Sequence, residues 1–470
     1  MASPPADVDL GKLSYEIFSL LETKFLFGGA APGSVPGTPG RAPPAFGDES
    51  GRGRVRVLAI DGCGPGPGDA LLAAVALARL EAALRARAGD PGARVADFFD
   101  AAAGAGAGGV LAAMLLLRGD DGRARYSAAD ALAFVAASLG SGSKGGRGWG
   151  GGGGGRRSRW ASLFRRGDSR DRAGSAALRR VFGDATLRDT VAPLLVPCYD
   201  LATAAPFLFS RADAVESDSF DFRLRDVCAA TCAQGAAATE VRSVDGRTAI
   251  AAASGGVAAM GNPTAAAITH VLHNKQEFPL AAGVDDLLVV SIGSGSSSGA
   301  TPSAGWRTPL PPRSPSPAEM VRLTADGVAD MVDQAVAMAF GHTCGRNYVR
   351  IQAAACSGGG NKPVDAKKAV AQADGMLAQR NVEAALFRGR RLSEKSNGEK
   401  LDAFAAELVK EHERRARCPP GLLPNVVIKQ HAATPPRLSS ATTASSSTAT
   451  ATARSVSTMP SPASQGSYHH

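Results

Sequence analysis

Residues 95–118 read VADFFDAAAGAGAGGVLAAMLLLR, an apolar run that passes through a cluster of glycines and alanines into a second apolar run. This pattern is typical of a strand that turns sharply into a helix at a nucleophile elbow, where a G-x-S-x-G motif holds its central side chain on a strained turn. The central position of this stretch is Gly106. Glycine permits the turn but supplies no nucleophile, so this one position bears on whether the chain is an enzyme.

The small residues around Gly106 indicate that the frame of such an elbow is present. Close approach of a helix to a strand requires residues with little or no side chain, and the stretch supplies Gly104, Ala107 and Gly108. The first N–H groups of the following helix would lie near a developing oxyanion. We therefore predict an elbow that has the backbone turn of such a site and lacks the nucleophilic side chain.

Two further glycine loops accompany the elbow. DGCGPGPG occupies residues 61–68 and SGG occupies residues 254–256, and each follows an apolar strand, as GAGAGG does at 104–109. Successive N–H groups of a glycine loop can converge on an anion, and the amino end of a helix adds its dipole. The three loops together predict one composite site that binds an oxyanion, a phosphate or a carboxylate.

The order of expected elements indicates the fold class. Strands alternate with helices between residues 55 and 300, which favours an α/β fold with a mostly parallel sheet covered on both faces, and with function at the carboxyl ends of the strands. We expect helices through residues 319–417, including AQADGMLAQRNVEAAL, and in the last of them a stripe of Leu401, Phe404, Leu408 and His412.

Composition divides the chain into parts. We expect an amphipathic helix and a Gly/Pro linker over 1–50, an α/β domain over 51–300 with a Gly/Arg-rich insert at 140–172, a helical part of the same fold over 301–430, and a disordered Ser/Thr/Ala tail over 431–470. The amino-terminal helix either docks on the domain or lies in a bilayer interface, because its charges are mixed.

With these motifs the chain resembles the patatin family of lipid acyl hydrolases, over about residues 50–300 and through FFDAAAGAGAGG, CYDLATAAPFLFS and SGGVAAMGNP, with NVEAALF near 382 in the helical part. The resemblance implies a patatin-like three-layer α/β fold, deacylation of membrane glycerolipids (phospholipids and galactolipids), and no cofactor or metal. Patatins use a D-G-G-G oxyanion loop, a G-x-S-x-G nucleophile and an aspartate base before two small residues. The oxyanion loop corresponds here to Asp61, Gly62, Cys63 and Gly64, the nucleophile to Gly106, and the base to Ser254 before Gly255 and Gly256.

All three motifs depart from the family pattern. Cys63 replaces a glycine, the basic residue of the loop is missing, and both members of the serine–aspartate dyad are absent. A glycine at the nucleophile position, together with HVLHNKQEFPL, is most similar to the plant class III patatin-related phospholipases. Loss of a nucleophile–base unit costs several orders of magnitude in rate, although an oxyanion hole and binding alone retain about 10³- to 10⁴-fold over water.

Other residues offer substitute chemistry. A direct attack by water needs a base, for which Asp61, Asp69 and Asp100 are candidates, although an aspartate before glycines more often caps its own turn. Cys63 is a candidate substitute nucleophile without an evident histidine partner. Two alternative functions stay open: a catalytically silent lipid-binding or regulatory protein on the same scaffold, and a dinucleotide-binding protein reading Gly104, Gly106 and Gly109 as G-x-G-x-x-G. The second conflicts with the βα unit that precedes this motif.

The distribution of charge along the chain limits which classes of partner it can bind. The net charge of the 470-residue chain is +9, and the insert at 140–172 supplies nine Lys or Arg against two Asp, or +7 of it. The remainder is nearly neutral, which argues against nucleic acid. Either the insert is a solvated loop, or its aromatic and basic residues contact an anionic membrane surface; the candidates are Trp149, Arg156, Arg157, Trp160 and Phe164.

The seven cysteines are widely spaced and odd in number, which favours a reducing compartment, so we expect a cytoplasmic protein that can lie peripherally on membranes. Cys228 with Cys232 and His270 with His273 have spacings that a metal site can use, but no second ligand pair accompanies them, and buried structural roles are the favoured interpretation.

Overall fold

The computed structural model describes residues 53–62, 67–139, 172–233, 239–253, 260–293, 314, 316–353, 366–385, 389–417 and 427. The chain divides into two units, residues 1–52 and 53–470, and every described residue belongs to the second. The expected amino-terminal helix, nearly all of the insert at 140–172 and the tail at 431–470 lie outside the described residues, as do Cys63, Gly64, Ser254, Gly255 and Gly256.

An eight-stranded sheet forms the centre of the described unit, in the order β5-β6-β3-β2-β1-β7-β8 with β4 paired to β3. Strands β3, β2, β1, β7 and β8 run parallel, β4 and β6 each pair antiparallel with β3, and β5 pairs antiparallel with β6. The mostly parallel sheet is therefore confirmed. The strands are β1 (Val55–Ile60), β2 (Ala101–Gly104), β3 (Leu194–Asp200), β4 (Ala205–Ser210), β5 (Thr239–Arg242), β6 (Ala249–Ala253), β7 (Leu287–Ile292) and β8 (Tyr348–Ile351).

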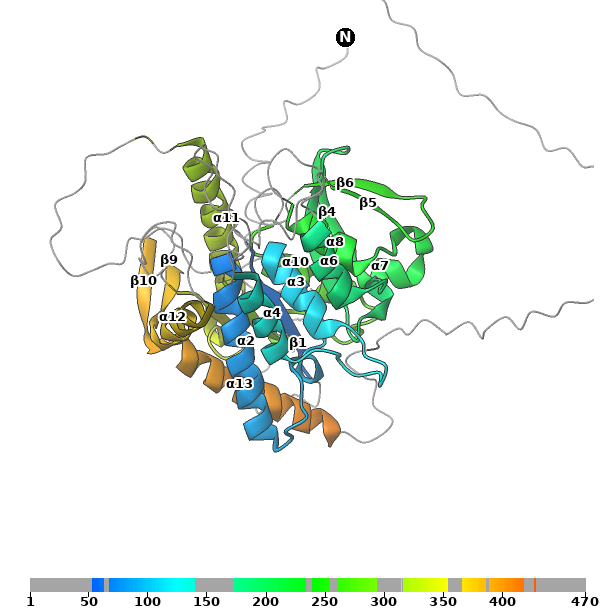
Figure 1. Cartoon of the computed structure of the whole chain (residues 1–470). Coiled ribbons are helices and arrows are strands. Elements are labelled where there is room, and N and C mark those ends of the chain that lie inside the picture. The colour runs from blue at the N-terminus through cyan, green and yellow to red at the C-terminus, as the bar shows by residue number, and fades with distance from the viewer. Residues whose placement is uncertain are drawn as a thin grey trace, which may run out of the picture. The chain divides into compact units, whose positions relative to one another are not determined.

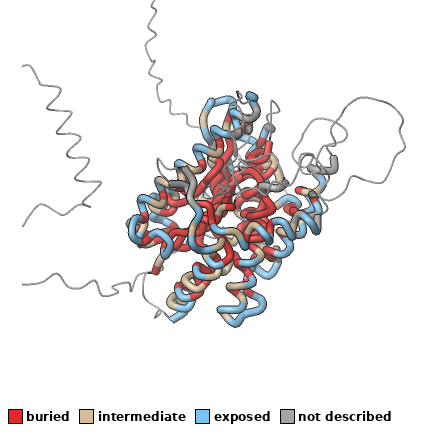
Figure 2. The backbone as a smooth tube through the Cα atoms, turned by 90° about the vertical axis from the view of Figure 1, so that its left-hand side faces the viewer, coloured by how far each residue is buried: buried red, intermediate tan, exposed pale blue. Residues whose placement is uncertain are grey.

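Helices cover both faces of this sheet (Figure 1). They are α2 (Pro67–Ala88), α3 (Gly106–Leu116), α4 (Ala128–Leu139), α6 (Arg172–Phe182), α7 (Arg211–Glu216), α8 (Leu224–Thr231), α10 (Thr264–His273), α11 (Pro317–Phe340), α12 (Ala366–Ala378) and α13 (Asn397–Ala416). Figure 2 shows the buried backbone concentrated in the interior, between these two helical layers.

Alternate residues of the central strands point into two separate cores. In β1, Leu58 and Ile60 join the core formed with α2, α3, α4, α8, α12 and α13. Val55 and Val57 of the same strand join the second core, with α10 and α11. Because side chains of a strand alternate between faces, a strand buried on both sides is apolar throughout, as VRVLAI nearly is. The three-layer α/β fold is thus confirmed.

The carboxyl-terminal part is less helical than expected. Residues 348–351 form β8 at the edge of the central sheet, and NVEAA lies in β9 (Arg380–Ala385), which pairs antiparallel with β10 (Gly389–Ser396). The prediction of helix through 380–385 was therefore wrong, because α12 ends at Ala378 and pairing with β10 overrides the local helical pattern. The expected stripe on α13 is confirmed for Leu401, Phe404 and Leu408, which are buried.

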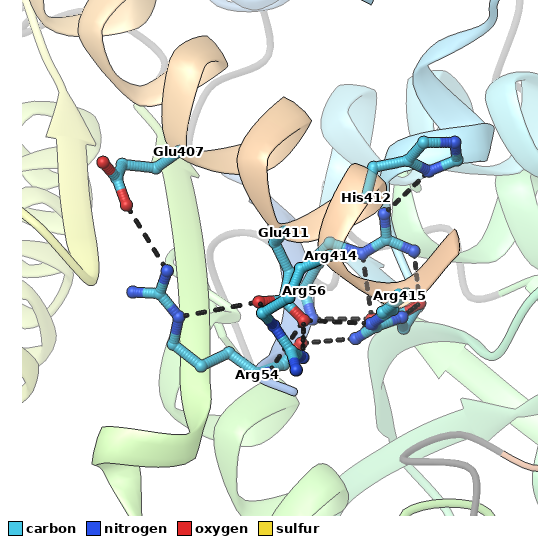
Figure 3. A network of polar contacts seen from close by, with 8 residues as sticks. Arg54, Arg56, Glu407, Glu411, His412, Arg414 and Arg415 are labelled. Carbon is cyan, nitrogen blue, oxygen red and sulfur yellow. Dashed lines mark hydrogen bonds and ion pairs between the residues drawn. The ribbon is translucent and has the colours of Figure 1, made fainter. Parts of the chain in front are cut away.

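A buried network of charges holds α13 against the amino ends of β1 and β2 (Figure 3). Asp100 precedes β2 and accepts hydrogen bonds of 2.8 Å from Arg56 Nη2 on β1 and 2.8 Å from Arg415 Nη1 on α13. Glu411 accepts from the Arg54 backbone N–H at 3.0 Å and pairs with Arg415 at 3.1 Å. This amino-end network closes the fold on the side of the sheet opposite the elbow.

Among the described residues, no helix has the length and apolar character required to cross a membrane.

Candidate functional site

The elbow forms where the sequence predicted it, at the carboxyl end of β2. Gly106 begins α3 with a φ of +51°, a left-handed conformation that side chains other than glycine rarely adopt. Its N–H donates to Thr231 Oγ1 at 2.9 Å, and the Thr231 hydroxyl donates to the Pro197 carbonyl at 2.8 Å. The strained turn is therefore fixed by a buried threonine of α8.

Small residues are required around this turn because backbones touch. A Cβ at Gly104 would lie 2.4 Å from the Gly108 oxygen, and a Cβ at Gly108 would lie 2.4 Å from the Ile60 oxygen. A Cβ at Gly62 would lie 1.8 Å from the Ala105 oxygen. These separations are shorter than real Cβ contacts, so β1, β2 and α3 approach as closely as the glycine pattern indicated.

Gly62 and Gly106 face each other across the site. A Cβ at Gly106 would lie 2.8 Å from the Gly62 carbonyl oxygen, and the Gly62 N–H donates in the other direction, to the Gly261 carbonyl at 3.2 Å. Gly62 therefore presents an acceptor to the elbow rather than a donor. The donors left at the elbow are the N–H groups of Ala107 and Gly108 in the first turn of α3, which have no acceptor within the described part of the chain.

The glycine turn that Asp61 is expected to cap continues through residues 63–66, which lie outside the described residues, and the described partner of Asp61 is on another strand. Its carboxylate accepts 2.9 and 2.5 Å hydrogen bonds from the two terminal nitrogens of Arg350 on β8, and both side chains are buried. Arg350 Nη1 also donates to Ser291 Oγ at 2.7 Å. Burial raises the pKa of Asp61 while Arg350 opposes the rise; burial lowers the pKa of Arg350, and Asp61 reverses this and raises it above its ordinary value. The bidentate pair fixes the start of the oxyanion loop.

Of the other two candidate bases, Asp100 does not join the elbow, and the Asp69 side chain lies outside the described ones. Asp100 lies at the opposite end of β2, and although burial acts to raise its pKa, Arg56 and Arg415 hold that pKa at about 2. A carboxylate that is fixed in this way is an ion-pair member and not a base for water at Gly106. Asp69 lies in α2, in a segment whose side chains are outside the description.

The cysteine and histidine pairs whose spacing could suit a metal lie in surroundings typical of structural residues. Cys228 and Cys232 are buried, and burial raises the pKa of both thiols. Burial lowers the pKa of His270 to about 4, and its ring lies edge-on to Phe278 with a centroid distance of 6.2 Å. Within the described ranges, no three His, Cys, Asp or Glu side chains gather as metal ligands would.

A cavity of about 800 Å³ lies beside the site, between α7, α10 and α11. Its wall includes Gly261, the residue that accepts the Gly62 N–H, so one hydrogen bond separates the cavity wall from the elbow. Apolar residues line it from three elements, among them Leu208, Ala266 and Val332, and its polar side includes His270 and Lys275. The size is that of a site for a small organic ligand, which is about 300–1,000 Å³.

Three residues of the site were missed by the sequence analysis: Thr231, Gly261 and Arg350. Each lies more than 120 positions from the site residue that it holds, since Thr231 binds Gly106, Gly261 binds Gly62 and Arg350 binds Asp61. No local motif marks Thr231 or Arg350, and Gly261 lies within SGGVAAMGNP without a role that its local sequence indicates. Their contacts arise only when α8, the turn before α10 and β8 pack against the glycine turns.

Comparison with known proteins agrees with the motifs. A family model described as patatin-like phospholipase matches residues 58–268. Patatin-like protein 3 of Oryza sativa subsp. indica is 54% identical over 417 residues, covering 86% of this chain and 92% of that protein. Patatin-like protein 7 of Arabidopsis thaliana is 45% identical, covering 92% and 86%. A relative described as probable inactive patatin-like protein 9 of Arabidopsis thaliana is 40% identical, covering 86% and 94%.

Proposed function

The chain belongs to the patatin-like phospholipase family, whose type is the lipid acyl hydrolase, and we propose that it deacylates membrane glycerolipids, both phospholipids and galactolipids, without a side-chain nucleophile at residue 106. The observation that carries the proposal is the retained elbow, where the Ala107 and Gly108 N–H groups at the start of α3 have no acceptor among the described residues and are proposed to donate to an ester oxygen.

The proposed reaction is hydrolysis by water at an ester held at the elbow. Water adds to the acyl carbonyl, the ester C–O bond breaks, and the lysolipid alcohol leaves with a proton while the fatty acid is released. The chain lacks the serine hydroxyl that would form an acyl-enzyme and the aspartate that would accept its proton. The proposed catalysis therefore depends on substrate binding and oxyanion stabilisation. Such sites keep about 10³- to 10⁴-fold acceleration over water, so we expect slow turnover.

Acyl release from phosphatidylcholine and from monogalactosyldiacylglycerol vesicles tests the proposal. The full-length wild type is compared with Cys63→Ala and with the double variant Gly106→Ser, Ser254→Asp, which restores the dyad of the family. Slow release by the wild type, unchanged in Cys63→Ala, supports hydrolysis by water. Release that disappears in Cys63→Ala would assign the nucleophile to Cys63 and contradict the proposal.

A second function is favoured by one contact at the elbow: that of a catalytically silent lipid-binding or regulatory protein. The Gly62 carbonyl lies 2.8 Å from the place of a Cβ at residue 106, so it occupies the space through which a serine side chain would leave the backbone. A 40% identical relative is described as probably inactive. No acyl release by the wild type, with vesicle binding retained, would establish this second function.

We also propose that the insert at 140–172 contacts anionic lipid through Trp149, Arg156, Arg157, Trp160 and Phe164, because aromatic side chains interleaved with cations suit an anionic interface. Flotation with phosphatidylserine-containing vesicles compares the wild type with a chain lacking 140–172. Equal flotation of the two proteins would remove this contact from the proposal.

A further inference from the structure

Helix α11 carries an apolar face that the described structure leaves exposed. Six large apolar side chains of this one helix are between 47% and 70% exposed: Met320, Val321, Leu323, Val328, Met331 and Met338. Met320, Met331 and Met338 recur at helical spacing on one side of α11, and Val321 and Val328 lie next to them around the helix. The opposite side, with Ala325, Ala329, Val336 and Phe340, is buried against the domain. Contiguous apolar exposure of this kind marks an interaction surface.

The cavity beside the elbow opens next to this face. Val328 belongs to both, since it is exposed on α11 and lines the cavity, where Val332 follows it one turn later. Asn262 of the cavity wall donates from Nδ2 to the Ala329 carbonyl at 3.2 Å, which fixes α11 against the turn that precedes α10. The cavity therefore lies between the apolar face of α11 and the elbow, because Gly261 in the same wall accepts a hydrogen bond from the Gly62 N–H.

This sequence of features fits an acyl chain drawn from a bilayer. The cavity wall is apolar at Leu208 on β4, Ala266 on α10 and Val332 on α11. Its polar side is formed by Asp213, Glu216, His270, Asn274 and Lys275. Burial holds the pKa of His270 at about 4, so this polar side is uncharged at His270 near neutral pH.

We propose that the exposed face of α11 docks on the surface of a phospholipid bilayer through apolar contact, and that the adjoining cavity receives an acyl chain of a lipid taken from it. The inference rests on the proposed glycerolipid substrate and adds the surface and the path by which that substrate reaches the elbow. It concerns a helix outside all three glycine motifs, and it does not depend on whether the elbow turns the lipid over.

Co-sedimentation of the full-length protein with phosphatidylcholine vesicles tests the docking. Met331→Asp with Met338→Asp places two charges on the two most exposed positions of the face, which are 70% and 68% exposed. We expect at least a tenfold loss of vesicle partitioning. Met331→Leu with Met338→Leu keeps the surface apolar and is expected to bind within twofold of the wild type. Leu201→Asp with Val244→Asp is the matched surface control, since these residues are 51% and 52% exposed outside α11, and it too is expected to bind like the wild type.

Binding and acyl release are measured on the same samples, so the two proposals fail separately. If the aspartate pair binds within twofold of the wild type, or if the wild type does not bind, the docking surface is wrong even where acyl release continues. If the aspartate pair loses binding while the wild type releases no acyl chain, docking stands and the hydrolase function fails. Sedimentation velocity identifies the other occupant: an aspartate pair that converts a dimer to a monomer without changing vesicle binding would assign the face to a second copy of the chain.

Filling the cavity tests its role separately from the docking. Ala265→Trp and Ala266→Trp add a large side chain to the cavity wall on α10. We expect vesicle binding to persist and the uptake of a fluorescent fatty-acid analogue to fall at least fivefold. Unchanged uptake in both variants would exclude the cavity as the acyl site.

Discussion

The two ends of strands β1 and β2 differ in how they are held. At the amino ends, Arg56, Asp100 and Arg415 form a buried ion network that fixes α13, and at the carboxyl ends Gly62 and Gly106 meet through backbone alone. At the carboxyl end of β1, the described residues place one charged pair, Asp61 with Arg350. Thus the charged groups of the described domain hold the fold together, and the elbow offers shape and backbone dipoles.

This difference bears on the two acidic residues that neighbour the elbow in sequence. Asp61 and Asp100 are each paired with arginine on another element. A base requires a carboxylate that can take up a proton near the operating pH, whereas the pKa of Asp100 is about 2, and the Asp61 carboxylate, whose pKa is raised by burial, accepts hydrogen bonds from Arg350 on both of its oxygens. The chemistry left to the elbow is therefore the orientation and polarisation of a bound ester.

Breaking the amino-end network gives the largest expected effect. Asp100→Ala leaves Arg56 and Arg415 without their shared carboxylate, and loss of one partner of a buried pair costs about 3–5 kcal/mol. Urea denaturation measures the free energy of unfolding. Asp402→Ala, which breaks the exposed pair with Arg79, is the control and is expected to cost at most about 1 kcal/mol. Equal losses would mean that the buried network does not hold α13.

Breaking the Asp61–Arg350 pair at the elbow end comes next. Arg350→Met leaves the buried Asp61 carboxylate without its partner, with an expected loss of about 3 kcal/mol in the free energy of unfolding. Arg350→Lys retains the charge but not the two-pronged geometry, so it should recover part of the loss. If Met and Lys give the same stability as the wild type, Asp61 is held by other groups.

The pH dependence of stability separates the network from ordinary surface charge. Because the folded pKa of Asp100 is about 2, below its ordinary value of 3.8, its contribution is present above about pH 4 and is lost as the pH falls toward 2. The shift corresponds to about 2 kcal/mol. The free energy of unfolding, measured from pH 5 to pH 2, should fall less steeply in Asp100→Asn than in the wild type. Parallel curves for the two proteins would contradict the low pKa of Asp100.

The smallest expected effect tests the backbone contact between Gly62 and Gly106 at the elbow. Gly106→Ala adds a Cβ at a φ of +51° and 2.8 Å from the Gly62 oxygen, whereas Gly89→Ala has a similar φ of +67° with nothing within 4 Å. The left-handed conformation alone costs about 1–2 kcal/mol in each. The contact is expected to make Gly106→Ala the more destabilising by about 1 kcal/mol, as thermal unfolding can show. Equal costs would mean that Gly62 moves freely away from the elbow.

The C-terminal region shows where sequence reasoning reached its limit. NVEAA has helix-forming residues, and the preceding Ala366–Ala378 is helical, yet residues 380–385 pair with Gly389–Ser396 as a hairpin. Local propensity is a weak preference that neighbouring strands override. By contrast, the elbow was predicted correctly because its glycines are required by local geometry. Gly106 adopts a left-handed conformation, and the glycines beside it allow α3 to approach the strands closely.

The sequence by itself determined the α/β class, the elbow and the absence of a hydroxyl at residue 106, because these depend on residues adjacent in the chain. Only the tertiary structure decided what surrounds the elbow: the Thr231 hydroxyl on the Gly106 N–H, the Gly62 carbonyl turned toward it, and Arg350 on Asp61. These partners come from separate strands and helices, and no spacing in the chain records them. Packing of the sheet brings them together, and packing also leaves the apolar face of α11 exposed beside the cavity.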